Sequence, residues 1–201
     1  MERKRQVERK TKETNIKVEL NVDGKGESKI STSIALFDHL LTQIAVHGCF
    51  NLNIITEGDL AIDNHHTIED TAIVLGKAFN QALGDKKEIT RVAHSFFPMD
   101  ECLAFVAVDI SSRPFFRKEI TWKNQFLGSK EESLIPVDLI EHFLYSFSIN
   151  AKITLHVRML YGDNNHHMAE AIFKALGKAL DYASRIDPKR EQILPSSKGY
   201  L

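Results

Sequence analysis

The sequence has few of the features that mark secreted, membrane-spanning or nucleic-acid-binding proteins. Two cysteines, Cys49 and Cys102, stand in 201 residues, which is too few for a disulfide framework and the wrong spacing for a Cys-x-x-Cys pair. The formal net charge is −1, so no general positive field attracts nucleic acid. The apolar run 103–110 has the length of a strand and contains Asp109, so it cannot span a membrane. We therefore expect a cytoplasmic protein without nucleic-acid or membrane partners.

The N-terminal segment is basic, but no apolar stretch follows it. Residues 1–12 are dense in Arg and Lys, and without a hydrophobic region they do not form a secretory signal. We expect a solvated basic arm there. The whole chain is 43% apolar and 26% charged, which is typical of a globular protein. Its length allows one large domain or two small fused ones.

The most informative feature is an internal repeat. The segment N-H-H-T-I-E at 64–69 returns as N-H-H-M-A-E at 165–170, an offset of 101 residues (165 minus 64). At the same offset, L-G-K-A at 75–78 returns at 176–179. A duplicated core needs to keep only its apolar periodicity. The repeated histidines and carboxylate therefore point to chemistry.

Apolar spacing predicts the same order of elements in both halves. It predicts strands at 16–22, 29–34, 52–56, 102–110, 114–122 and 153–157. Helical stripes predict helices at 36–46, 64–83, 137–149 and 165–183. Because Asp23-Gly24 is a turn signal, we expect 29–34 to pair back on 16–22 as a hairpin, and 114–122 to pair with 102–110. The polar segment 128–132 is predicted to be a loop, and the tail 195–201 to be irregular.

Each half is thus a β-β-α-β-α unit, and we predict an α+β fold made by internal duplication. The small sheet and two helices of each half must cover each other's apolar faces. Two such halves pack most simply helix layer to helix layer, so we expect the helices between two small mixed sheets. The first half is predicted at 1–90, with the N-terminal arm, and the second at 91–201, with the C-terminal tail.

The repeated motif places metal-ligand residue types at the start of a helix. His65 and Glu69 are four residues apart and share a helix face, and His66 is also a neighbour of Glu69. The two adjacent histidines are about 100° apart around the axis, so they can face different centres. The second copy has the same arrangement at positions 166, 167 and 170. Asn64 and its counterpart Asn165 are the expected N-caps.

A third histidine in each half belongs to the same repeat. D-H-L-L at 38–41 corresponds to E-H-F-L at 141–144 on the preceding helix, at an offset of 103 (142 minus 39). Six of the nine histidines therefore fall at matched positions. Together with two glutamates they provide enough ligands for two metal sites of about four ligands each. The eight candidate ligands are His39, His65, His66, Glu69, His142, His166, His167 and Glu170. Imidazole and carboxylate ligands without thiolate suit Mn, Fe, Zn, Ni or Cu.

With these residues the chain resembles the imidazoleglycerol-phosphate dehydratase family of histidine biosynthesis. The resemblance covers nearly the whole chain, and both H-H motifs are highly specific to that family. It is carried by F-D-H-L-L at 37–41, D-N-H-H-T-I-E-D at 63–70, S-R-P at 112–114, E-H-F at 141–143, N-H-H-x-x-E-A-x-F-K-A at 165–175 and P-S-S-K-G at 195–199.

The resemblance implies a reaction, a cofactor and an assembly. The reaction is the loss of water from D-erythro-imidazole glycerol phosphate to give imidazole acetol phosphate. The cofactor is Mn(II), two ions per active site, held by the eight candidate ligands. The assembly is a homo-oligomer of 24 subunits with its active sites between subunits, each subunit having a helix layer between two sheets.

The implied chemistry explains why metal and carboxylate occur together. The hydrogen removed lies on a carbon attached to an imidazole and is only weakly acidic. A metal on an imidazole nitrogen stabilises the imidazolate, which then expels the neighbouring hydroxyl through a diazafulvene-like intermediate. A carboxylate must move the proton, and Glu13 matches the family's catalytic glutamate.

The resemblance also implies the substrate contacts. The phosphate needs fixed cations or backbone donors, and by resemblance these come from Arg91, Arg113, Ser197 and Lys198. Three histidines are also expected to contact the substrate: His39, His47 and His65. His47 fits a satisfied core histidine equally well.

Three departures from the family pattern put local loop geometry in question. Cys49 stands where glycine is common, and Ser112 stands in place of the glycine of the commoner S-G-R-P. Segment 91–93 is R-V-A in place of R-F-G. None of these positions is a candidate metal ligand.

Two other functions fit part of this ligand set. A di-metal hydrolase usually has a carboxylate bridging its metals, whereas the two glutamates here lie in separate halves and favour separated ions. Release of inorganic phosphate would identify such an enzyme. A metal-storage or metal-sensing assembly would not need the three cations Arg91, Arg113 and Lys198, and it would take up metal without turnover.

Overall fold

The structure, a computed structural model, describes residues 3–129 and 134–201. These residues form four α-helices and ten strands, with a 3-10 helix, η2, at Pro188–Arg190. The helices are α1 (Ala35–Gly48), α2 (His65–Ala82), α3 (Val137–Ala151) and α4 (Asn165–Ser184). The strands are β1 (Lys4–Lys10), β2 (Thr14–Asn21), β3 (Ser28–Ser31), β4 (Asn51–Gly58), β5 (Val92–Met99), β6 (Cys102–Asp109), β7 (Phe115–Glu119), β8 (Phe126–Leu127), β9 (Ile135–Pro136) and β10 (Thr154–Tyr161).

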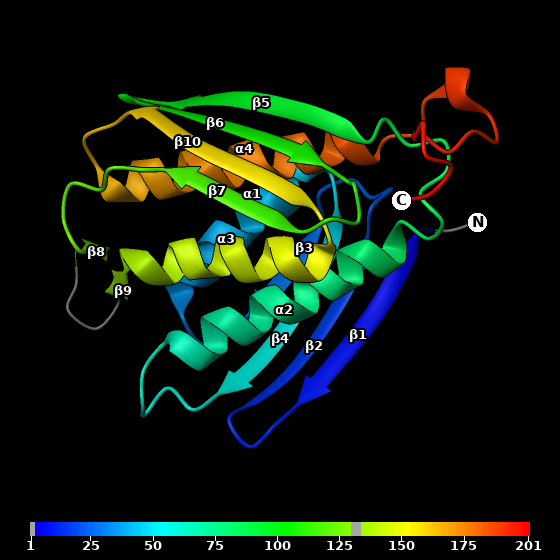
Figure 1. Cartoon of the computed structure of the whole chain (residues 1–201). Helices are drawn as coiled ribbons and strands as arrows, with labels where there is room; N and C mark the ends of the chain where they lie inside the picture. Colours follow the sequence, from blue (N-terminus) through cyan, green and yellow to red (C-terminus); the bar gives the residue numbers. More distant parts are fainter. Residues whose placement is uncertain (1–2, 130–133) are drawn as a thin grey trace.

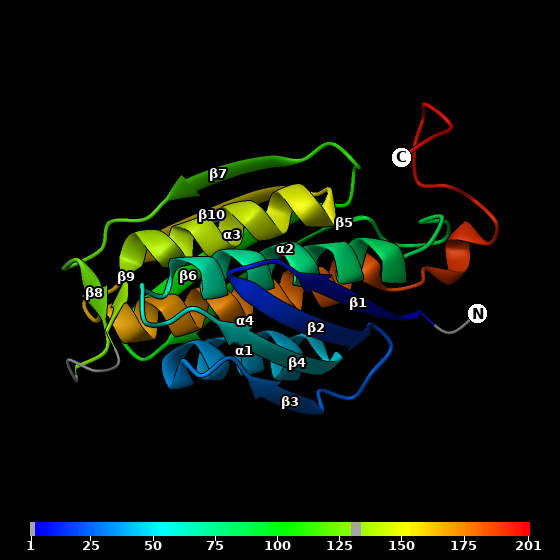
Figure 2. The same ribbon diagram turned by 90° about the horizontal axis from the view of Figure 1, so that it is seen from below.

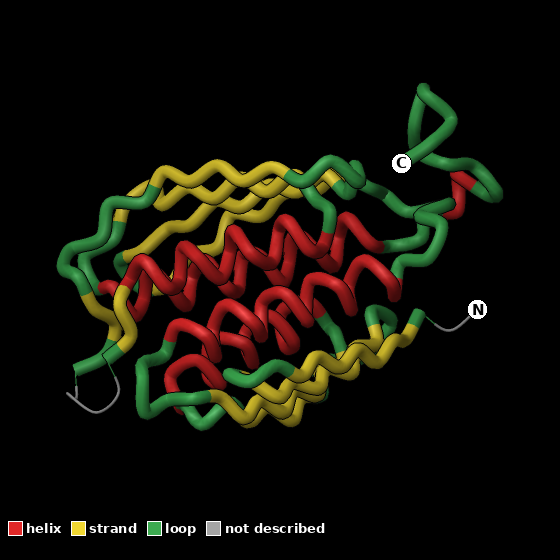
Figure 3. The backbone as a smooth tube through the Cα atoms, turned by 60° about the horizontal axis from the view of Figure 1, so that its bottom comes forward, coloured by secondary structure: helices red, strands yellow, loops and turns green. Residues whose placement is uncertain are grey.

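The four helices lie between two four-stranded sheets (Figure 1, Figure 3). The strand orders are β1-β2-β4-β3 and β5-β6-β10-β7, and in each sheet the last strand joins in parallel. Helix α2 packs on the first sheet and against α3, while α4 packs on the second sheet and against α1. In the view from below, the first sheet runs along one side of the helices (Figure 2). The predicted α+β fold, with helices between two mixed sheets, is confirmed, and each unit begins with one strand more than predicted.

The first additional strand lies in the segment predicted to be a solvated arm. Strand β1 pairs antiparallel with β2 along its whole length, from Lys4 opposite Asn21 to Lys10 opposite Asn15. The prediction of an arm was wrong for residues 4–10, because an edge strand can be charged on its outer face and still be held by backbone hydrogen bonds. Residues 1 and 2 lie outside the described residues.

The predicted hairpin partners were also wrong. Strand β3 pairs in parallel with β4, with Ser28 opposite Leu52, because both edges of β2 are occupied by β1 and β4. In the same way β7 pairs in parallel with β10, with Phe115 opposite Thr154, rather than with β6. The second additional strand, β5, occupies the free edge of β6. The two halves therefore share one topology, including its parallel edge.

The sheets and helices bury the alternating apolar residues that predicted them. In β2 the side chains of Ile16, Val18 and Leu20 face the helices and are fully buried. The repeated glycines Gly76 and Gly177 allow close helix crossings: an added Cβ would lie 2.7 Å from the Phe147 carbonyl oxygen of α3 and 2.8 Å from the Ile44 carbonyl oxygen of α1, respectively. The repeat therefore preserves helix packing as well as the ligand types.

A longer connection distinguishes the second half. Strands β2 and β6 begin at Thr14 and Cys102, 88 residues apart, whereas β4 and β10 begin at Asn51 and Thr154, 103 residues apart. The extra residues lie between β7 and α3 and include the β8–β9 ladder. Of the predicted loop 128–132, residues 130–132 lie outside the described residues, as does residue 133.

Two of the three residues that replace a family glycine have a left-handed backbone, whereas the third, Ala93, lies in β5. Cys49 has a φ of 55° and ends α1, and Ser112 has a φ of 56°. Lys152, at the equivalent end of α3, has a φ of 54°. A side chain in this region costs about 1 kcal/mol relative to glycine. The irregular tail at 195–201 is as predicted, and no helix among the described residues is long and apolar enough to cross a membrane.

Candidate metal centre

The starts of α2 and α4 are fixed by side chains that accept hydrogen bonds from the first backbone N–H groups of each helix. In α4 the Asn164 side chain accepts hydrogen bonds from the backbone N–H groups of His166 and His167, at 2.8 and 3.3 Å. In α2 the Asp63 carboxylate accepts from the His65 N–H at 2.7 Å. Asn64 is the N-cap of α2, as predicted, although its side chain makes no capping hydrogen bond. The N-cap of α4 is Asn164, so the prediction of Asn165 was wrong by one residue. Asn165 instead donates its amide to the connection 124–126, which ties the start of α4 to the longer loop of the second half.

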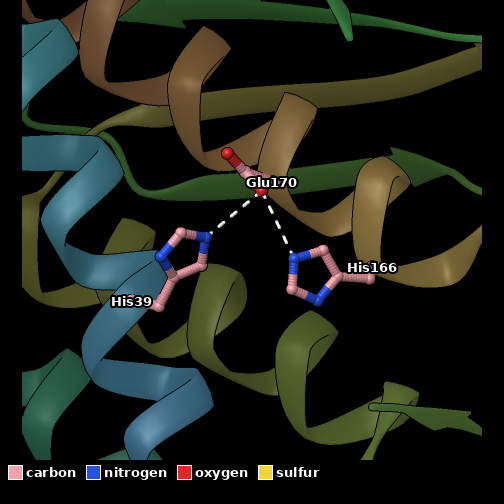
Figure 4. Close-up of side chains that lie close together, drawn as sticks. All are labelled: His39, His166 and Glu170. Atoms are coloured by element: carbon pink, nitrogen blue, oxygen red, sulfur yellow. Dashed lines mark hydrogen bonds and ion pairs between the residues drawn. The ribbon is translucent and has the colours of Figure 1, made fainter. Parts of the chain in front are cut away.

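The α4 cluster consists of His39, His166 and Glu170 (Figure 4). His39 comes from α1, and the other two lie four residues apart at the start of α4. One oxygen of Glu170, Oε2, lies 3.2 Å from His39 Nε2 and 3.4 Å from His166 Nε2. The two imidazole rings are stacked, with centroids 5.7 Å apart. Two nitrogens and one carboxylate oxygen therefore converge on one point.

The α2 cluster consists of His65, Glu69 and His142. The first two lie at the start of α2, and His142 comes from α3. Glu69 Oε2 lies 3.2 Å from His65 Nε2, and Glu69 Oε1 lies 3.3 Å from His142 Nε2. The latter pair lacks hydrogen-bond geometry, so His142 Nε2 is a buried nitrogen without a hydrogen-bond partner among the described residues. A buried imidazole nitrogen beside a carboxylate is a donor set that suits a divalent ion.

Each cluster joins the two halves of the chain. Because α1 packs on α4 and α2 on α3, the third histidine of one half meets the H-H-x-x-E motif of the other. In each cluster the three donor atoms lie within 4.8 Å of one another. Glu69 and Glu170 belong to different clusters, which agrees with the expectation of separated ions and not with a shared bridging carboxylate.

The second histidine of each pair lies outside the two clusters. His66 Nδ1 lies 3.0 Å from Asp59 Oδ2, and His167 Nδ1 lies 2.9 Å from Glu101 Oε2. These hydrogen bonds raise the pKa of both histidines, and the one from His167 lowers the pKa of Glu101 to about 2. Of the eight predicted ligands, the structure thus brings six together in two clusters and holds the other two beside separate carboxylates.

Burial and charge distinguish the carboxylate of the α4 cluster. The Glu170 side chain is 9% exposed, and its second oxygen, Oε1, accepts from Lys174 Nζ at 2.8 Å. Burial opposes ionisation, but hydrogen bonds from Lys174 and His39 outweigh it and lower the pKa of Glu170. Burial lowers the pKa of His166, although Glu170 partly offsets this effect. These shifts favour an ionised Glu170 carboxylate beside a neutral His166 imidazole.

The predicted catalytic residue, Glu13, lies beside His66. Its Oε1 is 3.9 Å from His66 Nε2, and its side chain is 53% exposed. It directly precedes β2, so the sheet fixes its backbone while the side chain stays free to reach a ligand.

The four residues predicted to hold the phosphate line one pocket of about 380 Å³. They are Arg91, Arg113, Ser197 and Lys198. The Arg91 guanidinium is already engaged: it forms two hydrogen bonds to the Asp109 carboxylate, at 2.7 and 3.1 Å, and donates to the Pro195 carbonyl oxygen at 2.6 Å. Arg91 therefore also anchors the C-terminal tail against the second sheet.

His47 lies apart from both clusters. It is two turns beyond His39 on α1, a rise of about 12 Å, and its ring packs edge-on against Phe97 with centroids 4.9 Å apart. Burial and the charge of Lys174 lower the pKa of His47.

Three residues of the site were missed at the level of sequence: Asp59, Glu101 and Lys174. One signal for Glu101 was present, because it occupies in the second half the position that Glu13 occupies in the first, directly before a strand. Asp59 and Lys174 have no counterpart of the same type at the repeat-equivalent positions, Gly162 and Ile73, so comparing the halves could not find them.

The fold and site define an α+β protein made by duplication, with two His-His-Glu clusters and a separate pocket rich in positive charge. The sequence model of the imidazoleglycerol-phosphate dehydratase family matches residues 32–180. The chain is 52% identical to the imidazoleglycerol-phosphate dehydratase of Thermoanaerobacter pseudethanolicus, over 99% of this chain and 100% of that one.

Solved structures of the same enzyme are also similar. The one from Pyrococcus furiosus has a TM-score of 0.80 and 33% identity, covering 97% of this chain and 100% of its own. The one from Staphylococcus aureus has a TM-score of 0.77 and 34% identity, covering 89% and 96%. The chain belongs to the imidazoleglycerol-phosphate dehydratase family, whose members are hydro-lyases of histidine biosynthesis.

Proposed function

We propose that the chain removes water from D-erythro-imidazole glycerol phosphate to give imidazole acetol phosphate, using two Mn(II) ions per active site. The observation that carries this proposal is the pair of His-His-Glu clusters, each assembled from both halves of the chain. Nitrogen and oxygen donors without thiolate suit Mn(II). Three ligands in each cluster leave positions open for a further histidine and for substrate.

A bound Mn(II) ion would supply a Lewis acid that orients the substrate imidazole and stabilises negative charge on its ring nitrogens. The residues of the α2 and α4 clusters would hold the ions through their Nε2 atoms and carboxylate oxygens. Because Glu69 and Glu170 both face histidine nitrogens, each contributes a negative charge that favours a dication.

Glu13 is the proposed proton carrier. Its exposed carboxylate, 3.9 Å from His66 Nε2, is close enough to a ligand nitrogen to reach substrate bound there. The acetol product carries its carbonyl one carbon away from the carbon attached to the imidazole, which requires the reverse of the assignment made from the sequence. The hydroxyl on the carbon attached to the imidazole leaves as water, and Glu13 removes the proton from the neighbouring carbon. The enol so formed tautomerises to the ketone of the product.

The phosphate pocket and the clusters of one chain are too far apart to share a substrate. The Arg91 N–H bonds the Ala183 carbonyl oxygen near the end of α4, whereas His166 lies at the start of that helix. Seventeen residues of helix rise about 26 Å, far more than the length of a glycerol phosphate. We therefore propose that the pocket holding Arg113 and Lys198 acts together with clusters of another copy.

The outer faces of the two sheets support self-association into the proposed 24-subunit assembly. The outer face of the second sheet is aromatic: Phe96 is 55% exposed and packs against Phe105, with ring centroids 4.7 Å apart, and Phe115 is also 55% exposed. The outer face of the first sheet is mostly Lys, Glu and Asn. An apolar patch of this kind favours contact with another protein surface. Ligands shared between copies would make assembly depend on metal.

Product formation tests the proposed reaction directly. Purified protein loaded with Mn(II) is incubated with imidazole glycerol phosphate, and the ketone product and inorganic phosphate are both measured. We expect the acetol phosphate with no phosphate release, and loss of activity when EDTA removes the metal. Phosphate release would identify a hydrolase instead, and metal uptake without any turnover would identify a storage or sensing protein.

A further inference from the structure

The two halves hold the second histidine of each pair by carboxylates from different places. His66 Nδ1 bonds to Asp59, which directly follows β4. His167 Nδ1 bonds to Glu101, which directly precedes β6. Both bonds act on Nδ1 and so leave Nε2 as the nitrogen with a free lone pair.

The repeat shows that these two carboxylates are not equivalents of one another. The counterpart of Glu101 is Glu13, directly before β2, and the counterpart of Asp59 is Gly162, directly after β10. In each half one carboxylate accepts the hydrogen bond of the histidine Nδ1. It follows a strand in the first half and precedes a strand in the second, where Asp100 lies farther from Nδ1, at 3.9 Å.

The second half has no room for a carboxylate at the position of Asp59. A Cβ added to Gly162 would lie 2.6 Å from Cys102 Sγ and 2.7 Å from Met168 Cγ, both closer than packed atoms approach. In that half the histidine is therefore held by Glu101, whose side chain is only 35% exposed.

In the first half the equivalent glutamate, Glu13, does not accept the hydrogen bond of the histidine Nδ1. Asp59 occupies Nδ1 of His66, so Glu13 stands 3.9 Å from the other nitrogen, with a side chain 53% exposed. The Asp59 N–H donates to the Glu13 carbonyl oxygen at 3.1 Å, which fixes the two residues next to one another.

We propose that Asp59 is a positioning residue that holds His66 in the orientation needed for Nε2 to bind an ion, and that this leaves Glu13 free to move the substrate proton. In the second half Glu101 performs the holding task itself. The inference rests on the proposed function, because it assigns Glu13 its role through the metal-dependent dehydration. It explains why one carboxylate of a duplicated pair acts on substrate and its counterpart does not.

Measured Mn(II) affinity separates positioning from proton transfer. Dissociation constants and the number of ions bound are determined by equilibrium dialysis for the full chain and for Asp59→Asn, Glu101→Gln and Glu13→Gln, alongside kcat and KM. Glu57→Gln is the control, because it removes a carboxylate two residues from Asp59 on an outward-facing position. Removing a carboxylate behind a metal-binding histidine weakens metal binding by roughly 10–100-fold.

We expect Asp59→Asn to raise the Mn(II) dissociation constant of half of the sites by roughly 10–100-fold, and Glu101→Gln to do the same for the other half. Glu13→Gln should leave both affinities within about twofold while turnover falls by roughly 100-fold or more. Unchanged affinity in Asp59→Asn, or weakened affinity in Glu13→Gln, would overturn the inference.

A second variant distinguishes the loss of the carboxylate from a folding defect in Asp59→Asn. Asp59→Glu keeps a carboxylate that can reach Nδ1, and it should recover most of the affinity at equal thermal stability. If Asp59→Glu binds as weakly as Asp59→Asn, the positioning role is contradicted. A parent chain that binds no Mn(II) or shows no turnover would contradict the proposed function instead.

Discussion

The α2 and α4 clusters carry the same residue types at repeat-equivalent positions, yet their carboxylates stand in different surroundings. Glu69 is 33% exposed, and its two oxygens face one histidine each. Glu170 is 9% exposed, and one oxygen faces both histidines while the other accepts from Lys174. Duplication has therefore kept the ligands but not the charge around them, and the two clusters should hold their ions with different strength.

The largest expected effect comes from breaking each cluster at its carboxylate. We expect Glu69→Gln and Glu170→Gln each to reduce bound Mn(II) from about two ions per chain to about one, the number that eight ligands fill at four each. Metal analysis of the purified variants measures this.

The same two variants should differ in stability. Glu170→Gln leaves the Lys174 ammonium, whose side chain is only 16% exposed, without its partner, and it should lower the free energy of unfolding by roughly 3 kcal/mol in EDTA. Glu69→Gln removes a half-exposed group and should cost less than about 1 kcal/mol. Equal losses in urea unfolding would show that burial does not distinguish the clusters.

A smaller effect should follow from making the clusters more alike. Lys174→Ile introduces the residue found at the equivalent position 73. The Lys174 ammonium lies 2.8 Å from Glu170, and its removal makes the electrostatic potential at the α4 cluster more negative. Mn(II) affinity at that cluster should therefore rise about tenfold. Calorimetric titration measures the change, with Lys77→Ile on the exposed face of α2 as control. A weaker α4 site in Lys174→Ile would mean that the lysine helps to hold the ion's ligands in place.

The pH dependence of metal binding should be set by the histidines outside the clusters. Their pKa values are raised by hydrogen bonds to Asp59 and Glu101, so they keep a proton to higher pH than an ordinary histidine. Metal must displace that proton. Affinity should therefore fall a few-fold per pH unit below these raised pKa values and level off above them. In Glu101→Gln the pKa of His167 returns toward 6.5, so the fall should begin at lower pH. A Mn(II) affinity that does not change between pH 6 and 8 would contradict the predicted fall at low pH.

The smallest effect concerns the left-handed residues that end α1 and α3. Cys49 and Lys152 have nearly the same φ, 55° and 54°, so replacement by glycine should relieve similar strain. We expect Cys49→Gly and Lys152→Gly each to stabilise the apo chain by roughly 0.5 kcal/mol, because the unfolded glycine chain gains entropy that offsets part of the relief. Thermal unfolding in EDTA measures the change, and destabilisation by both variants would contradict it.

Much of the fold could be predicted because the repeat and the helical stripes are strong local signals. All four helices were found, and their ends differ from the prediction by at most two residues, the usual uncertainty of a boundary. The edge strands β1 and β5 were missed because their residues alternate weakly: β1 is mostly charged, and β5 exposes Val92 and Phe96. Strand partners depend on which edges are already occupied, which no local pattern records. The boundary between halves at residue 90 stays a prediction.

The ligand types could be predicted from the repeat, but their grouping could not. Only the packing of α1 on α4 and of α2 on α3 decides that His39 meets Glu170 and that His142 meets Glu69. Lys174 and Asp59 act through tertiary proximity alone, so neither spacing nor repetition marks them. The roles of Glu13 and of the phosphate pocket came from resemblance, and they remain proposals.

One crystallographic measurement tests the central claim, that the two clusters are separate metal sites. Crystals grown with Mn(II) are measured at a wavelength where manganese scatters anomalously, and the peaks are located against the chain. We predict two peaks per chain, one beside His39, His166 and Glu170 and one beside His65, Glu69 and His142. Each ion should be completed by His66 or His167 of a second copy. A single peak bridged by both glutamates, or peaks at neither cluster, would contradict the account.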